Sequence, residues 1–282
     1  MHQRKNSISL YCGFAEEIRA YGIEEAARRI SERGFSTVEM LETAKEPQNG
    51  VIADVETARR AKEILERYGL SLSCYSLLAR LWTPGMTKEY AAWQDARIRH
   101  FASIAAALGS PFLHHTLATV RDETPYGAVL ETVVSRAIPH VDYAASLGLT
   151  VLYEPQGPYF NGCEGFGTLY RTVKAERPSI GICGDVGNTV FVNEDPAPFF
   201  SEFAREMRHV HLKNYYLNTD GGDVTRNGTF VKDAAIGDGE LDLAPCITAL
   251  REANYSGAFA IESKDPRSIE QAEQLLKTYF FV

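Results

Sequence analysis

Hydrophobic and polar positions alternate along this chain in a repeating order. A short apolar run comes first, and a longer stretch follows in which apolar residues recur every three or four positions. The first short run is Ile8–Cys12, and the stretch Gly22–Gly34 after it places Ile23, Ala26 and Ile30 on one helical face. Short apolar runs are typical of buried strands, and the longer spacing is typical of amphipathic helices. The pattern therefore predicts strands that alternate with helices.

The same order occurs eight times, without a linker or a change of composition between the units. Strands are expected at Ile8–Cys12, Thr37–Leu41, Leu72–Leu77, Pro111–His115, Val151–Glu154, Ile180–Asp185, His209–Lys213 and Phe259–Glu262. Helices are expected at Gly22–Gly34, Asp54–Tyr68, Lys88–Leu108, Tyr126–Leu147, Pro196–Met207, Leu243–Ala253 and Ser268–Phe280. After the fifth strand we expect a loop at Gln156–Gly167, and then a helix that ends near Glu176.

Parallel strands joined by helices need right-handed crossovers, and eight strand–helix units close into a barrel. We therefore predict an α/β fold, a (β/α)8 TIM barrel, as a single domain over residues 1–282. The polar residues 1–7 are expected to form a flexible N-terminal tail, and they lack the apolar centre of a signal peptide. A doubly wound open sheet is the alternative, but Cys12–Glu17 does not form its glycine-rich phosphate loop.

One stretch, Asn214–Asp242, interrupts this order. It is long, polar and rich in glycine, with Gly221, Gly222, Gly228, Gly237 and Gly239. Connections longer than ~15 residues are usually lids or binding loops. Because this stretch follows the seventh strand, we expect it to be a loop on the catalytic face of the barrel, able to close over a ligand.

Composition and charge narrow the range of functions. The chain has 282 residues, 45% of them hydrophobic, with a net charge of −8 and a sequence pI of about 5.5. An acidic surface is unfavourable for nucleic acid, and no run approaches the ~18 apolar residues of a membrane span. The five cysteines are widely spaced and form no C-x-x-C pair, which argues against a disulfide framework and a structural zinc site. We expect a cytoplasmic protein that binds neither nucleic acid nor a membrane.

Four of the expected strands end in a residue that binds metals or moves protons, namely Glu154, Asp185, His211 and Glu262. In a parallel barrel these ends meet at the face that carries the active site. Three carboxylates and one imidazole suit a single divalent ion; we expect Mn²⁺, with Mg²⁺, Co²⁺, Fe²⁺ or Zn²⁺ as alternatives. One carboxylate at a strand end is more often a capping or ion-pairing residue, so the prediction depends on the four together.

Further residues near these strand ends are candidates for substrate contact. Glu154 and Glu262, expected on opposite sides of the site, are the natural pair for proton transfer. Asn188 and Lys213 follow the predicted ligands closely enough in the sequence to bind substrate, although Lys213 equally fits an exposed surface position.

Two assignments depend on which way a side chain points. Successive side chains on a strand face opposite sides, so one of His114 and His115 is expected to face the site, and we assign His115 to substrate binding. Glu39 lies early on the second strand, and we interpret it as a structural carboxylate that is buried and paired inside the barrel.

Several short motifs occur in a characteristic order along nearly the whole chain. They are Gly34–Glu39, Tyr153–Pro155, Gly184–Asn188, His209–Lys213, Gly237–Asp242 and Ile261–Ser263. In this order they resemble the sugar phosphate isomerase/epimerase family with a xylose isomerase-like TIM barrel. The resemblance implies that Glu154, Asp185, His211 and Glu262 bind the metal. It also implies that Glu154 and Glu262 move protons on either face of a sugar, through an enediolate that the metal holds.

These observations predict a metal-dependent isomerase or epimerase of a small sugar, sugar phosphate or related keto compound. The family's ketose epimerases carry a substrate-contacting histidine where this chain has Asn188, and an amide cannot donate a proton near neutral pH. A dehydratase of an inosose or similar keto-polyol is therefore the alternative. An AP-endonuclease-type phosphodiesterase would need more histidine ligands and a basic groove, and a non-catalytic sugar-binding barrel is a further hypothesis. The expected partner is a small carbohydrate substrate, and a homo-oligomer is compatible with the sequence.

Overall fold

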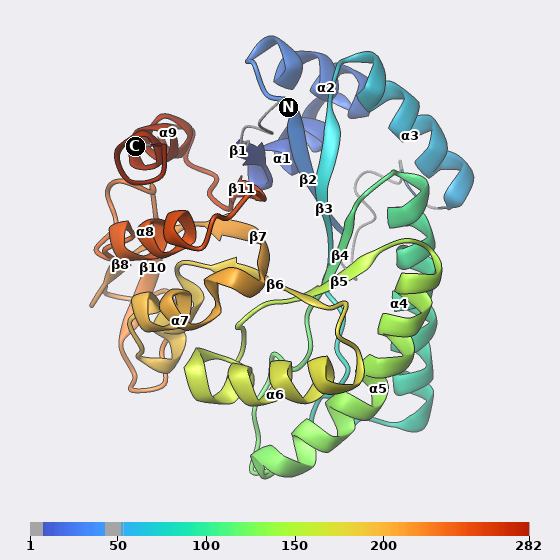
Figure 1. The fold of residues 1–282 in the computed structure, drawn as a ribbon, viewed down its shortest axis with the longest axis vertical. Coiled ribbons are helices and arrows are strands. Elements are labelled where there is room, and N and C mark those ends of the chain that lie inside the picture. Colours follow the sequence, from blue (N-terminus) through green and yellow to red (C-terminus); the bar gives the residue numbers. More distant parts are fainter. Residues whose placement is uncertain (1–7, 43–51, 53, 282) are drawn as a thin grey trace.

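A closed barrel of parallel strands lies at the centre of the computed structural model, which describes residues 8–42, 52 and 54–281 (Figure 1). The strands follow the order β1-β11-β7-β6-β5-β4-β3-β2 around the barrel. Their bounds are β1 Ile8–Leu10, β2 Thr37–Glu42, β3 Ser71–Leu77, β4 Phe112–His115, β5 Thr150–Tyr153, β6 Gly181–Asp185, β7 Met207–Leu212 and β11 Ala258–Ile261. The predicted α/β class and (β/α)8 barrel are confirmed. The tail predicted at residues 1–7 lies outside the described residues.

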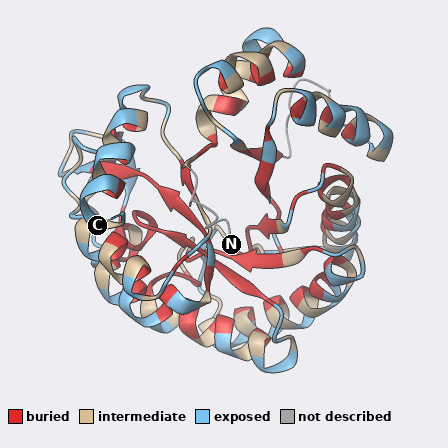
Figure 2. Cartoon of the chain, turned by 45° about the horizontal axis from the view of Figure 1, so that its top comes forward, coloured by how far each residue is buried: buried red, intermediate tan, exposed pale blue. Residues whose placement is uncertain are grey.

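Helices surround this barrel and cover the outward side of its strands. They are α1 Cys12–Tyr21, α2 Ile23–Glu32, α3 Val55–Arg67, α4 Lys88–Ala107, α5 Tyr126–Ser146, α6 Gly162–Glu176, α7 Pro196–Phe203, α8 Ala244–Glu252 and α9 Arg267–Tyr279. Figure 2 shows the strands almost wholly buried, and the helices buried on the side that faces them. Among the helices of the described chain, none is both long and apolar enough to cross a bilayer.

Helix α3 shows how the sequence produces this arrangement. The Asp54 side chain accepts a hydrogen bond from the Thr57 backbone, and the Thr57 hydroxyl accepts one from the Asp54 backbone, so the first turn is capped from both sides. Ala58, Ala61 and Leu65 recur at helical spacing and are buried against the barrel. The predicted cap at Asp54 is therefore confirmed.

One helix was not predicted, and another begins earlier than predicted. The first strand ends at Leu10, and helix α1 occupies Cys12–Tyr21, where no helix was predicted. Its start has no side-chain cap, so no local signal marks it. Helix α6 begins at Gly162, within the predicted loop Gln156–Gly167, because the Asn161 side chain caps it by accepting from the Gly162 backbone N–H.

The stretch Asn214–Asp242 also differs from the predicted loop. Much of it forms a separate antiparallel sheet in the order β8-β10-β9, with β8 at Asn214–Leu217, β9 at Asp223–Val224 and β10 at Phe230–Ala234. Tyr215 and Val231 on one face of this sheet pack against Val190, which follows β6. The insertion is thus a folded wall with its own small hydrophobic cluster.

The barrel interior becomes more polar toward the ends of the strands. Cys74, Leu152 and Cys183 form a small buried apolar cluster inside it. The Ser9 and Ser73 hydroxyls hydrogen-bond each other at 2.7 Å. Small inward residues leave room for larger polar ones, and Ala260 and Asp185 both lie directly across the ladder from His211.

Candidate active site

The four predicted metal ligands come together at the carboxyl ends of strands β5, β6, β7 and β11. Glu154, Asp185, His211 and Glu262 each offer one ligand atom, and these atoms all lie within 4.8 Å of one another. His211 Nδ1 lies 2.8 Å from Glu154 Oε1, 3.2 Å from Glu262 Oε2 and 3.8 Å from Asp185 Oδ2. The backbone N–H of Glu262 donates to Leu212 O. This hydrogen bond extends the β11–β7 ladder by one residue and holds the backbone from which the Glu262 side chain projects.

The turn after β6 sets the orientation of Asp185. Its Oδ1 accepts hydrogen bonds from the backbone N–H groups of Gly187 at 2.8 Å and Asn188 at 2.7 Å, so its Oδ2 faces the other ligands. A Cβ on Gly187 would collide with the Tyr215 ring and the Lys213 side chain, so this position requires glycine. The local turn thereby presents one carboxylate oxygen to a cation.

Lys213 places a positive charge among these carboxylates. Its Nζ lies 2.9 Å from Asp185 Oδ2 and 3.0 Å from Glu262 Oε2. The side chain is buried, which rules out the surface position that the sequence also allowed. Burial lowers the pKa of Lys213, but Asp185 and Glu262 outweigh burial and raise the pKa well above its usual value. The ammonium group therefore stays charged and balances one of the three carboxylates.

Behind His211 lies a second, fully buried carboxylate. Glu39 accepts hydrogen bonds from His209 Nε2 at 2.6 Å, from His211 Nε2 at 3.1 Å and from the Ser76 hydroxyl. The predicted pairing of Glu39 inside the barrel is confirmed. A metal-binding histidine commonly donates its second ring N–H to a carboxylate, which fixes the ring and its tautomer. Glu39 has this relation to His211, whose other nitrogen faces the ligand cluster.

The two catalytic candidates have opposite acidities. Burial raises the pKa of Glu154 to about 7, although its contact with His211 acts in the other direction. Burial also acts to raise the pKa of Glu262, but the charges of Lys213 and His211 outweigh it and lower the pKa to about 2. With these neighbours, one carboxyl group is able to hold a proton near neutral pH while its partner remains ionised.

The adjacent histidines of β4 point to opposite sides, and the site histidine is His114. His114 Nδ1 lies 2.9 Å from the Ser76 hydroxyl, and its Nε2 lies 3.6 Å from Glu154 Oε2. His115 faces outward and packs edge-on against Tyr153 at 5.4 Å between ring centroids. The structure does not bring His115 to the site, so the prediction that it contacts substrate is wrong. The alternation of side chains along the strand is the reason.

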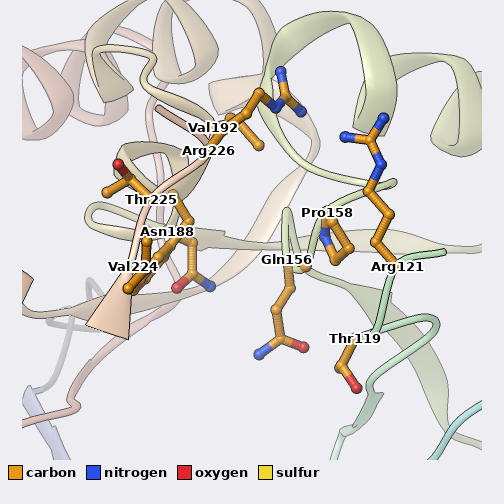
Figure 3. Close-up of a pocket in the computed structure, with 11 residues that line it drawn as sticks. Thr119, Arg121, Gln156, Pro158, Asn188, Val192, Val224, Thr225 and Arg226 are labelled. Carbon is orange, nitrogen blue, oxygen red and sulfur yellow. The ribbon is translucent and has the colours of Figure 1, made fainter. Parts of the chain in front are cut away.

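A cavity of about 570 Å³ is lined in part by residues that closely follow the candidate ligands Glu154 and Asp185 in the chain (Figure 3). Its lining includes Asn188, whose backbone holds Asp185, and Gln156, two residues after Glu154. Asn188 Nδ2 and Gln156 Oε1 are buried without a hydrogen-bond partner. Unpartnered buried polar atoms are costly, so these two amide atoms are candidates for hydrogen bonds to a ligand.

The donor set fits a divalent metal ion. Asp185 Oδ2 and Glu262 Oε2 are buried, and both face His211 Nδ1 and the Lys213 ammonium group. Three carboxylate oxygens with one imidazole nitrogen suit Mn²⁺, Mg²⁺, Co²⁺, Fe²⁺ or Zn²⁺, and this chemistry alone does not select among them. Candidate groups also form around Glu39, His209 and His211, and around Glu154, Cys183 and His211, but each of these shares His211 with the main set.

The family of the chain follows from its sequence. Residues 27–279 match the xylose isomerase-like TIM barrel family, and the chain belongs to it. An inosose dehydratase of Geobacillus thermodenitrificans (strain NG80-2) is 26% identical over 149 residues, which are 50% of this chain and 49% of that protein. The chain therefore spans about half the length of the curated relatives it matches.

Solved structures share the fold at lower identity. The IOLI protein with a bound zinc atom superposes with a TM-score of 0.77 at 12% identity, covering 98% of this chain and 100% of that one. The probable 3-DHS dehydratase of Bacillus anthracis superposes with a TM-score of 0.71 at 16% identity, covering 96% and 98%. At these identities the likeness concerns the fold alone.

Sequence reasoning missed several residues of this region. The Tyr11 ring stacks on His211 with centroids 5.1 Å apart, and it was assigned to the first strand rather than to the site. Arg121 and Arg226 line the cavity from two loops far apart in the chain. The position of Tyr11 could have identified it, because it directly follows the first strand, and this strand pairs with β11. No local signal identifies either arginine.

Proposed function

We propose that this protein is a metal-dependent dehydratase that removes water from a cyclic or linear keto-polyol. The observation that carries the proposal is the convergence of Glu154, Asp185, His211 and Glu262 within 4.8 Å at the carboxyl end of the barrel. Two carboxylates that lie beside a candidate cation site suit the removal of a proton next to a carbonyl group. The metal identity and the role of each glutamate are part of this proposal.

Each residue of the site has a separate role in the proposed dehydration. When bound, a divalent ion would polarise the substrate carbonyl and stabilise negative charge on its oxygen. One of Glu154 and Glu262 takes the proton from the carbon next to the carbonyl. The other gives a proton to the hydroxyl on the following carbon, so that the C–O bond breaks and water leaves. Glu39 keeps His211 oriented, and the Asn188 amide hydrogen-bonds a substrate hydroxyl.

Dehydration is preferred here to the isomerase or epimerase reaction first expected from the sequence. Named relatives of this chain are inosose dehydratases, and a structure with the same fold is a probable 3-DHS dehydratase. Asn188 also replaces the histidine that the family's ketose epimerases carry. Epimerisation shares the first proton transfer and differs in the next step, in which the second carboxyl group delivers a proton to the opposite face of the same carbon and no water leaves.

Product analysis with labelled solvent tests the proposal. The protein is stripped with a chelator, reloaded with Mn²⁺, Mg²⁺, Co²⁺ or Zn²⁺, and incubated in D2O with an inosose and with a ketohexose. We expect a product lighter by one water, formed only with metal. Deuterium exchange at the carbon next to the carbonyl would report proton removal even without elimination, and a product of unchanged formula would indicate an epimerase or isomerase.

Matched variants separate catalysis from folding. Glu154→Gln keeps the size of the side chain and removes the proton acceptor, so we expect kcat to fall by roughly 10²- to 10⁴-fold. Glu63→Gln on the exposed face of α3 makes the same chemical change far from the barrel end and should be neutral. No metal dependence, or no loss of rate in Glu154→Gln, would contradict the proposal.

A further inference from the structure

The cavity lined by Gln156 and Asn188 has two chemically different ends. Figure 3 shows the side chains of Gln156 and Asn188 extending to one side of it, and those of Arg121 and Arg226 extending to the other. The amide atoms Gln156 Oε1 and Asn188 Nδ2 are buried, whereas both arginines are exposed residues. The neutral hydrogen-bonding groups therefore lie inside, and the positive charges lie at the mouth.

Both arginines project from anchored backbone. The backbone N–H of Arg226 donates to Phe191 O at 2.9 Å, and the next backbone N–H, that of Asn227, donates to Asn193 Oδ1 at 2.9 Å. These bonds tie the turn between β9 and β10 to the segment that follows Asp185 and Asn188. The position of Arg226 is thus coupled to the wall of the cavity.

Arg121 belongs to the loop between β4 and α5, which is held from the other side. Its guanidinium lies 6.0 Å from the centre of the Tyr159 ring, and the Tyr159 hydroxyl donates to Thr124 O at 3.1 Å. Gly157 has a φ of +72°, and a Cβ there would collide with the Ala118 carbonyl oxygen. This close approach joins the β4 and β5 loops, so Arg121 and Gln156 lie on one continuous wall.

Among the described residues, no carboxylate neutralises either guanidinium. Within the described part of the chain, no ion pair joins Arg121 or Arg226 to a carboxylate, although the protein as a whole is acidic. Both arginines also line a neighbouring hollow, together with Asp122, Glu123, Glu164 and Glu194, but none of these four described carboxylates lies within ion-pair distance of either guanidinium. Asp122 and Glu194 each have a backbone partner. Asp122 accepts from the Thr124 N–H at 2.8 Å, and Glu194 accepts from the Cys163 N–H at 3.0 Å.

We propose that the substrate carries an oxyanion, a carboxylate or a phosphate, and that Arg121 and Arg226 bind it at the mouth of this cavity. This inference rests on the proposed function, because it takes the cavity as the substrate pocket. The planar guanidinium matches a carboxylate or phosphate with paired donors. A substrate held there directs its hydroxyl-bearing part inward, toward Asn188, Gln156 and the carboxylates that move protons.

Binding measurements that need no turnover test the inference. Fructose, fructose 6-phosphate and 5-ketogluconate differ chiefly in their anionic group, and they are titrated by calorimetry into the Mn²⁺-loaded protein. We expect at least one anion to bind about 10-fold or more tightly than fructose, and the preferred anion distinguishes phosphate from carboxylate. Arg121→Gln and Arg226→Gln should each weaken anion binding roughly 10- to 100-fold, and the double variant should approach the affinity for fructose.

The controls keep this result specific. Arg60→Gln removes an exposed arginine from α3 and should change none of the three affinities. Fructose binding should change less than about threefold in the arginine variants, and anion binding should weaken with added salt because both groups are exposed. Equal affinity for fructose and both anions, no anion binding at millimolar concentration, or full anion affinity in the double variant would overturn the inference.

The two proposals fail in different ways. If an anion binds through the arginines but no deuterium exchange occurs with any metal, the proposed function fails and the anion site stands. If exchange occurs and the arginine variants bind and turn over anionic and neutral compounds alike, the proposed function stands and the anion site fails.

Discussion

The buried contact between Glu39 and two histidines provides a sensitive test of how the site is built. In Glu39→Gln, one carboxylate oxygen becomes an NH2 group of nearly the same size. Glu39 accepts from His209 Nε2 at 2.6 Å and from His211 Nε2 at 3.1 Å. An amide offers a single acceptor oxygen, so at least one imidazole N–H then faces another donor.

The size of the effect follows from the burial of these groups. Burial alone would raise the pKa of Glu39, but the charges of His211 and His209 outweigh it and hold the pKa far below its usual value. Removing one partner of a buried charged pair costs about 3–5 kcal/mol, and losing the carboxylate behind a metal-binding histidine costs about 10- to 100-fold in metal affinity. We expect both losses in Glu39→Gln.

Two measurements check this prediction. Urea unfolding of the metal-free protein gives the free energy of unfolding, and calorimetric titration with Mn²⁺ gives the metal affinity. Glu63→Gln, on the exposed face of α3, serves as the control and should leave both unchanged. A free energy within about 1 kcal/mol of the wild type, together with unchanged Mn²⁺ affinity, would refute the role assigned to Glu39.

Three further perturbations test other contacts. Lys213→Met removes the ammonium group that balances the carboxylates, so the metal-free protein should lose roughly 3 kcal/mol of stability. Mn²⁺ should raise the Tm of this variant more than it raises the Tm of the wild type. An equal Tm shift in both proteins would contradict this prediction. Gly157→Ala strains a residue with φ of +72° and collides with Ala118 O, so urea unfolding should show a loss of about 1–3 kcal/mol, whereas Gly127→Ala within α5 should cost nothing. Burial lowers the pKa of His115 to about 4, so the unfolded chain takes up the proton first and stability falls with pH from about 6.5 toward 4. In His115→Gln the decrease in the free energy of unfolding between pH 7 and pH 5 should be smaller by roughly 2 kcal/mol. An unchanged decrease would contradict the lowered pKa of His115.

The barrel itself could be predicted because its signals are local and repeat along the chain. Apolar runs and amphipathic stretches alternate, and caps such as Asp54 mark helix starts. The sheet formed by β8, β9 and β10 could not, because it depends on pairing between segments such as Lys232 and Tyr216, which are polar or exposed. Helix α1 begins without a cap, and its existence depends on packing of Phe14 and Ile18 against the barrel.

The candidate site likewise contains residues that a local sequence signal predicts and residues that it does not. Glu154, Asp185, His211 and Glu262 were found because each ends an apolar run, and a parallel barrel brings such ends together. The choice between His114 and His115 depends on strand phase, which one residue of slippage reverses. The arginines of the cavity depend on where two loops meet in space, and such proximity is not encoded by local spacing.

The arrangement of the cavity has a consequence for how this protein can change. The carboxylates proposed to transfer protons, Glu154 and Glu262, follow the barrel strands directly, whereas Arg121 and Arg226 lie on a loop and on a turn of the inserted sheet. Exposed loop positions tolerate substitution better than buried strand ends. A library that varies only these two positions should therefore shift the range of accepted substrates while the reaction and the stability of the fold are retained. The residues proposed for the reaction and those proposed for substrate selectivity thus lie on separate parts of the chain. Evolution could change the substrate range without changing the reaction.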